Sequence, residues 1–261
     1  MNKIEVSIID LSGEKIFSAE GHQKVELVFT RRYQEGDRIQ IVLPEDHFLK
    51  IRLDESMEEA AVFGRKGIFE YIIPAGEEKM AYPPKAFSGE AHKVIVEYRE
   101  KETMPVNLSR NVWDVRGASN IYPHCTATVE TRGEAVFAAR NTIDGMTETE
   151  WHGMWPYTSW GEGEDSEAEI RIDFGRPVQV EEVQIFLRAD FPHDNYWKEA
   201  ELLFDDGKSV KLSLEKTGQP QSFVFEDIQT EWVVMKNLKK DENDSSPFPA
   251  LTQWVVYGRN V

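Results

Sequence analysis

The chain has 261 residues, with 30 Lys and Arg against 47 Asp and Glu and a formal net charge of −17. This length has room for two domains, each with its own core. The acidic balance argues against nucleic acid and anionic membrane surfaces as partners, because phosphate contacts need clustered Lys and Arg. The single cysteine, Cys125, excludes an intramolecular disulfide framework.

The first hundred residues alternate apolar and polar side chains in short runs. These runs cover residues 3–9, 24–29, 37–43, 48–53, 68–74 and 93–99, with Gly and Pro between them. Period-two alternation places one face of each strand in a core. We therefore predict an antiparallel β-sandwich over residues 1–104, which carries no motif that identifies a family.

Two further stretches are expected to lie where this sandwich meets the rest of the chain. Tyr82 and Phe87 flank two prolines within residues 81–89, and packing against a neighbouring domain explains this tract better than ligand binding. Residues 105–116 form the connection. Its Val112, Trp113 and Val115 are too apolar for a free linker, so we expect the segment to follow the domain junction.

Alternating runs continue through the second half of the chain. Residues 168–188 indicate a strand, a Gly-Arg-Pro turn and a second strand, and further runs follow at 199–204, 209–214, 221–228, 231–238 and 252–258. Many short strands with turn signals between them predict a sandwich or jelly roll. The predicted fold class is therefore all-β, with two antiparallel β-sandwich domains, the second covering residues 117–261.

The loop NTIDGMTETEWH, residues 141–152, has the chemistry of a cation site. Asp144 supplies a carboxylate, Gly145 permits a sharp turn, and Thr149 offers a hydroxyl beside its own carbonyl. Such oxygen ligands suit Ca²⁺ or Na⁺ rather than zinc. An Asp-Gly pair is also a common turn without any ion. We expect Trp151, which ends this motif, to lie in the core, together with Trp232 and Trp254.

The same loop and the strands after it carry a resemblance to a known family. The features are the small-residue run, Ile-Asp-Gly, Thr and Trp of residues 138–151, the segment IDFGRPVQVEEV at 172–183, the Asp206-Gly207 turn and the closing strand to Tyr257. Over about residues 117–261 the chain resembles the galactose-binding-like superfamily, which includes coagulation-factor type C (discoidin) domains and family 32 carbohydrate-binding modules. The resemblance implies an eight-stranded jelly roll and a structural Ca²⁺ or Na⁺ ion near one end.

The resemblance also implies which atoms would hold the ion. The family pattern has a glutamate where this chain has Gln253, and the missing carboxylate lowers the expected affinity, so Na⁺ or a vacant site stays open. The implied ligands are the carbonyls of Asn141, Met146, Thr149 and Thr252, the Thr149 hydroxyl, and the side chains of Asp144 and Gln253.

Two loops concentrate aromatic and charged residues, at 152–163 and 188–198. Aromatic faces pack on the C–H side of a sugar ring, and planar charged groups bind its hydroxyls. In family 32 modules the sugar sits in loops at one end of the sandwich, and a third loop at 244–253 adds Phe248. By resemblance, the predicted ligand-binding residues are Trp155, Arg188, Asp190, His193, Asp194 and Trp197.

These features predict a non-catalytic, lectin-like protein that binds a saccharide or glycan. Two other classes stay open. One is a glycan-processing enzyme that uses loop carboxylates such as Asp190 and Asp194 with His193. The other is an adaptor that binds a protein through the first sandwich, and a partner enzyme or homodimer is also open. Because the first residues form a strand pattern rather than a signal peptide, and no apolar run would span a bilayer, we expect a cytoplasmic protein.

Overall fold

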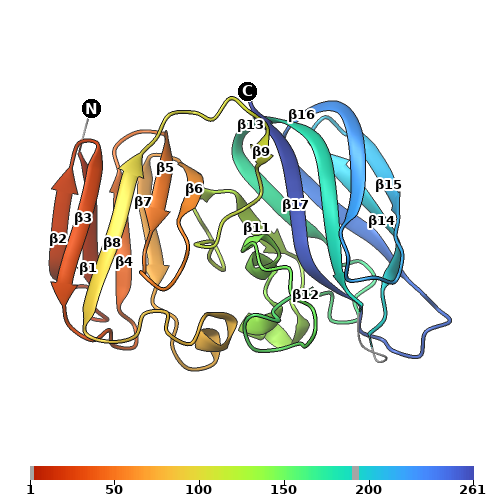
Figure 1. Cartoon of the computed structure of the whole chain (residues 1–261), viewed down its shortest axis with the longest axis horizontal. Helices are drawn as coiled ribbons and strands as arrows, with labels where there is room; N and C mark the ends of the chain where they lie inside the picture. The colour runs from red at the N-terminus through yellow and green to blue at the C-terminus, as the bar shows by residue number, and fades with distance from the viewer. Residues whose placement is uncertain (1–2, 190–193) are drawn as a thin grey trace.

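The computed structural model describes residues 3–189 and 194–261. Two β-sandwiches lie side by side, and short 3-10 helices fill the region between them at one end (Figure 1). The chain is therefore all-β, as predicted, and the sheets are antiparallel. Within the described residues, no helix is long and apolar enough to cross a membrane.

The N-terminal sandwich consists of two sheets. One has the order β2-β1-β4-β7, and the other has the order β10-β6-β5-β8-β3. Strands β2 and β6 were not expected from the sequence, because β2 is half-exposed without a clear alternation and β6 is short. The bounds are β1 (Ile4–Ile9), β2 (Lys15–Gly21), β3 (Lys24–Thr30), β4 (Arg38–Leu43), β5 (His47–Arg52), β6 (Ala60–Gly64), β7 (Gly67–Ile72), β8 (Ala91–Tyr98) and β10 (Ile121–Tyr122).

Eight strands build the C-terminal sheet system, whose main order is β12-β17-β13-β16-β14-β15. Two of the eight lie off this order, β11 beside β13 and β9 beside β17. The long strands β13 and β16 pair over most of their length. The bounds are β9 (Val106–Asn107), β11 (His124–Ala127), β12 (Trp160–Gly161), β13 (Ile170–Arg188), β14 (Trp197–Phe204), β15 (Ser209–Ser213), β16 (Gln221–Lys240) and β17 (Ala250–Asn260).

The expected Gly-Arg-Pro turn is a bulge within one continuous strand. Strand β13 runs through Gly175, and the pairing with β16 shifts register between Asp173 and Val178. Gly175 has a φ of +68°, and a Cβ added there would lie 2.3 Å from the Tyr122 ring. The glycine therefore bends the strand and admits an aromatic ring from the other sandwich, which is a common use of bulges. Runs 221–228 and 231–238 likewise join into β16.

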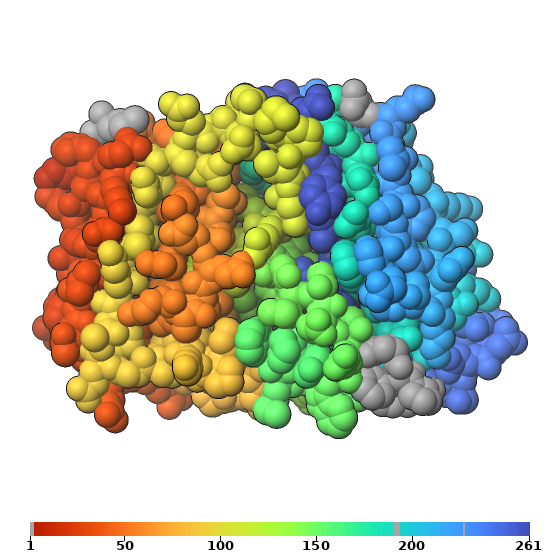
Figure 2. Space-filling view, viewed as in Figure 1, coloured from red at the N-terminus to blue at the C-terminus, as the bar shows by residue number. Residues whose placement is uncertain are grey.

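Two hydrophobic cores correspond to the two sandwiches, but the chain between them contributes to both. The first core contains Trp113 and Ile121, and it also contains Ala135, Val136 and Phe137 from the 3-10 helix η3 (Ala135–Phe137). The second core contains Leu108. Residues 105–116 thus contribute side chains to both cores, and Figure 2 shows a continuous surface there.

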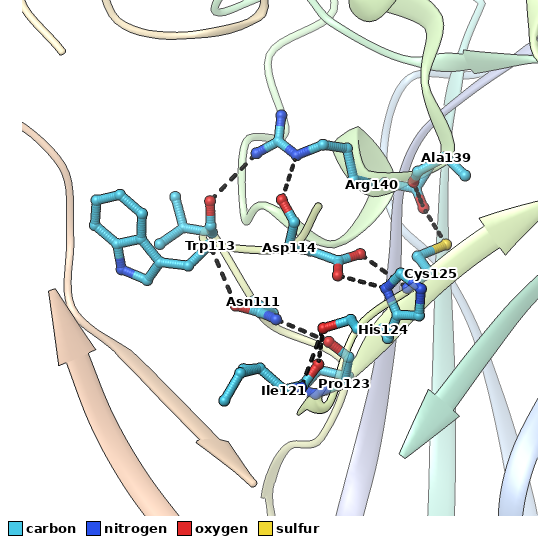
Figure 3. A network of polar contacts seen from close by, with 12 residues as sticks. Asn111, Trp113, Asp114, Ile121, Pro123, His124, Cys125, Ala139 and Arg140 are labelled. Atoms are coloured by element: carbon cyan, nitrogen blue, oxygen red, sulfur yellow. Dashed lines mark hydrogen bonds and ion pairs between the residues drawn. The ribbon is translucent and has the colours of Figure 1, made fainter. Parts of the chain in front are cut away.

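A buried polar network holds this junction together (Figure 3). The Asp114 carboxylate accepts hydrogen bonds from His124 Nδ1 at 2.7 Å and from the Cys125 N–H at 2.8 Å. Arg140 Nε donates to the Asp114 carbonyl at 2.7 Å. Burial lowers the pKa of His124, but the hydrogen bond and charge of Asp114 outweigh it and leave that pKa raised. All of these groups are nearly or fully buried, so each needs the partner it has.

The aromatic tract at 81–89 packs inward as expected. Tyr82 and Phe87 are buried, and the Arg140 guanidinium lies 4.6 Å from the centre of the Tyr82 ring. This cation–π contact joins the N-terminal sandwich to η4 (Ala139–Ile143) of the second half.

We expect a fragment of residues 105–261 to be more stable than a fragment of residues 117–261. The longer fragment keeps β9, the buried Leu108 and the Ser109 hydroxyl, which donates to the Trp254 carbonyl at 2.9 Å and accepts from the Val256 N–H at 3.0 Å. Burial of one Leu and two net hydrogen bonds together contribute about 3 kcal/mol. Urea unfolding followed by tryptophan fluorescence measures the difference. Equal stabilities would show that the connection belongs to the first unit alone.

Candidate functional site

A pocket of about 220 Å³ opens at the end of the C-terminal sandwich, where β13 ends and β17 begins. That end is the lower one in Figure 1. Register places Arg188, the last residue of β13, opposite Ala250, the first residue of β17. The wall is completed by loops from three other parts of the chain. The charged and aromatic lining residues discussed below are Arg132, Phe137, His152, Glu162, Arg188 and Phe248.

Arg188 and Asp194 form a buried ion pair beside the pocket. Their Nη2 and Oδ1 atoms are 3.5 Å apart, Asp194 is fully buried, and Arg188 is 6% exposed. The Arg188 guanidinium also lies 5.9 Å from the centre of the Phe137 ring. Two of the predicted ligand-binding residues are thus brought together. Arg188 faces the pocket, whereas Asp194 serves to neutralise it.

Trp197 has no face open to a ligand, which differs from the expectation that it stacks on a sugar. It is fully buried, and its ring centre lies 5.8 Å from that of Trp160. Its indole Nε1 donates to Glu162 Oε2 at 2.8 Å. Trp197 starts β14 on the core side of the sandwich, and Glu162 satisfies its only polar atom, so the residue acts as a core anchor.

Glu162 lines this pocket and is 4% exposed. Burial raises its pKa to about 7, although the Trp197 N–H and Lys240 act in the opposite direction. The group therefore changes charge near neutral pH. The residue was not singled out from the sequence, where it appears only as one acid in a Gly-rich acidic stretch.

Aromatic rings surround these polar groups. Phe137 is 8% exposed and contacts the Arg132 guanidinium, 5.4 Å from its ring centre, on the pocket side. Phe248, on the third loop, lines the same pocket and is 45% exposed. The sequence did not indicate Phe137 or Arg132, because both lie in irregular structure before the Asp-Gly loop and only the tertiary fold turns them toward Arg188.

Trp151 is 56% exposed and stacks on His152 with ring centres 5.9 Å apart, so its predicted place in the core is wrong. The reason is local: the chain forms no strand between η4 and β12, so Trp151 lies on a loop. Trp254 is fully buried, as predicted, and Trp232 is half-buried with the Arg171 guanidinium 4.3 Å from its ring centre.

Trp155 lies apart from Arg188, at the domain junction. Its backbone N–H donates to the Met80 carbonyl at 2.7 Å, and the residue lines a separate pocket of about 180 Å³ with Arg110 and Asp144. The structure therefore does not bring the predicted ligand-binding set into one site. Asp190 and His193 lie outside the described residues.

Four of the residues expected to bind a cation meet at one point on β17. Gln253 Nε2 lies 2.6 Å from the Asn141 carbonyl, 2.7 Å from Asp144 Oδ1 and 2.9 Å from the Thr252 carbonyl. Gln253 Oε1 accepts a hydrogen bond from the Gly145 N–H at 3.0 Å. The amide nitrogen thus stands among three of the oxygen atoms that the resemblance assigns to the ion, and this arrangement does not fit a cation at the same place.

The remaining two expected ligands have other contacts. The Met146 N–H donates to Asp144 Oδ1 at 2.8 Å, which closes the Asp-Gly turn. The Thr149 hydroxyl lies beside Gly218, since a Cβ added to that glycine would be 2.8 Å from it. Burial raises the pKa of Asp144 to about 6, while the Met146 N–H and Arg140 oppose the rise.

We expect Glu162→Gln to remove one component of the pH dependence of stability. A folded-state pKa of about 7, above the ordinary 4.5, means that the folded protein binds the proton more tightly between these values. The free energy of unfolding of the wild type therefore falls as pH rises through this window, by up to about 3 kcal/mol. The glutamine still accepts the Trp197 hydrogen bond, so the variant should be more stable than wild type at about pH 8 and similar at about pH 4. Urea unfolding at both pH values provides the measurement, and parallel profiles would contradict it.

No protein-family model matches the sequence, and no curated protein matches it. The solved structures do include similar folds. A chitosan-binding module of a chitosanase/glucanase from Paenibacillus sp. IK-5 is 19% identical, with a TM-score of 0.37, over 58% of this chain and 98% of that one. The family 32 module of C. perfringens NanJ, solved with galactose, is 19% identical, with a TM-score of 0.38, over 51% and 91%.

A fucose-binding module of Streptococcus pneumoniae is 13% identical, with a TM-score of 0.40, over 59% of this chain and 99% of that one. The NanJ module is of family 32, a family named in the resemblance above, and the three matches cover 51–59% of the chain.

Proposed function

We propose that the protein binds a saccharide, without reacting with it, in the pocket at the end of the C-terminal sandwich. One observation carries the proposal: the pocket combines aromatic rings with a nearly buried guanidinium and a nearly buried carboxyl group. The rings are those of Phe137, His152 and Phe248, and the polar groups are Arg188 and Glu162. Sugars present an apolar C–H face and a rim of hydroxyls, so a site needs both kinds of group.

The size of the pocket supports a small ligand. Its volume of about 220 Å³ lies below the roughly 300–1,000 Å³ common for drug-sized molecules. One sugar ring suits such a pocket, with the rest of a glycan extending past Phe248 at the rim. Arg188 is held by Asp194 and Glu162 by Trp197, so the polar groups keep their positions before a ligand arrives.

Binding is favoured over glycoside hydrolysis by the placement of the carboxylates. Hydrolysis needs two carboxyl groups on opposite sides of the scissile bond. Asp194 is fully buried and paired with Arg188, so it does not face the pocket. Glu162 and Glu164 both line the pocket, but they are only two positions apart in the sequence, which does not favour a placement on opposite sides of a substrate.

We expect Phe248→Ala to weaken saccharide binding by at least about tenfold, which corresponds to about 1.4 kcal/mol, because an exposed aromatic anchor is lost. Arg188→Lys should also weaken binding, because an ammonium group lacks the planar fork of the guanidinium. Titration calorimetry with galactose, fucose and chitosan oligosaccharides measures affinity, and circular dichroism checks the fold of each variant.

Trp155→Ala is the matched aromatic control, since Trp155 lines the other pocket, and it should leave affinity unchanged. Loss of binding in that variant, with Phe248→Ala unaffected, would move the sugar to the domain junction. Release of reducing ends from an oligosaccharide, abolished by Glu162→Gln, would instead establish an enzyme. A wild-type protein that binds no saccharide on a glycan array would refute the proposal.

A further inference from the structure

The Gln253 side chain of β17 makes polar contacts with the loop at residues 141–146, whose Ile143 also packs in the core of this sandwich. Its Nε2 contacts three oxygen acceptors, the Asn141 and Thr252 carbonyls and Asp144 Oδ1, at 2.6 to 2.9 Å. We propose that the side-chain amide of Gln253 takes the place of the structural cation, so that a hydrogen-bond donor and not a metal ion holds this loop on the sandwich. This inference is independent of whether the neighbouring pocket binds a saccharide.

The orientation of the amide follows from its surroundings. Its oxygen accepts the Gly145 N–H at 3.0 Å, and its nitrogen faces only acceptors. If the amide were turned over, Oε1 would face three oxygen atoms and Nε2 would face an N–H group. Such a reversal exchanges every favourable contact for a repulsive one, so the hydrogen-bond network determines which atom is nitrogen.

This orientation and a bound cation exclude one another. Ca²⁺ needs six to eight oxygen ligands at about 2.3–2.6 Å, and the amide nitrogen occupies the space between three of the expected ones. Turning Oε1 toward an ion would place the amide N–H₂ against the Gly145 N–H. A glutamate at this position could both bind an ion and accept the Gly145 N–H, because its carboxylate has two oxygen atoms.

The charges around the loop also disfavour a divalent ion. Asp144 is the one carboxylate among the expected ligand side chains. The positive charges of Arg140 and Arg110 both act on Asp144, and Arg110 is also paired with Glu58. A site whose one carboxylate already faces guanidinium groups offers less net attraction for Ca²⁺ than a site with two carboxylates. The neutral amide needs no charge compensation.

The first test uses the wild-type protein after treatment with a chelator. Its melting temperature should be the same with chelator, with added Ca²⁺, and after Na⁺ is exchanged for an organic cation, because a ligand stabilises a protein only if it binds the native state. Titration calorimetry should show no Ca²⁺ binding. A melting temperature that rises and saturates with Ca²⁺ or Na⁺ would overturn the proposal.

The second test creates the site. Gln253→Glu should lower the melting temperature in chelator, because two carboxylates then face each other across the loop, and added Ca²⁺ should raise it again to a plateau. Gln229→Glu, an exposed position on β16, adds the same charge and should give no Ca²⁺ response. If Gln253→Glu were stable and still indifferent to Ca²⁺, residue 253 would not decide metal binding; if it failed to fold, the wild-type measurement would still decide the question.

Discussion

A buried guanidinium at the junction of the two sandwiches sets the arrangement of the parts around it. Arg140 is 4% exposed. It donates to the carbonyls of Asp114 and Val112 and to the Asn141 side chain, and its plane lies over the Tyr82 ring. Removing a charge from water costs several kcal/mol unless such partners are supplied. Apart from the adjacent Asn141, these partners come from two separate stretches of the chain, residues 112–114 and Tyr82, so both must be in place at once.

The two sites described above depend on this arrangement. Arg140 belongs to η4, which leads directly to the loop that Gln253 fastens. The Asn141 amide donates to the Ala135 carbonyl at 2.9 Å and thereby fixes η3, which carries Phe137 into the pocket wall. One run of irregular backbone, residues 135–146, therefore places a pocket residue, a junction residue and the anchored loop.

Local sequence patterns determine some features of this fold, whereas others depend on contacts between residues far apart in the chain. Strands such as β3 were predictable because Val25, Leu27 and Phe29 alternate with exposed residues, and period two alone determines which face is buried. The place of Trp197 was not predictable in this way, because its burial depends on Glu162, a residue thirty-five positions earlier that accepts its N–H. Composition indicated that loop 188–198 was polar and aromatic, but not which of its side chains point inward.

The orientation of the Gln253 side chain is another feature that the sequence alone does not predict. The departure from glutamate was visible in the sequence, and it indicated a weaker cation site. That the amide would direct its nitrogen at the expected ligands depends on the Gly145 N–H, which is brought to it across the sandwich. The chemical identity of a residue is local information, whereas the direction of its donors is decided by what the fold places opposite them.

Phe137 gives the pocket a connection to the other half of the molecule. Phe137 belongs to the hydrophobic core of the first sandwich, and its ring also lies against Arg188 in the pocket of the second sandwich. A ligand that packs on this ring would therefore contact a residue whose position depends on how the two sandwiches pack against each other. If the docking of the sandwiches changes the position of this ring, a partner that shifts the docking and a ligand on the ring would change each other's affinity by the same factor, because coupling free energies are reciprocal.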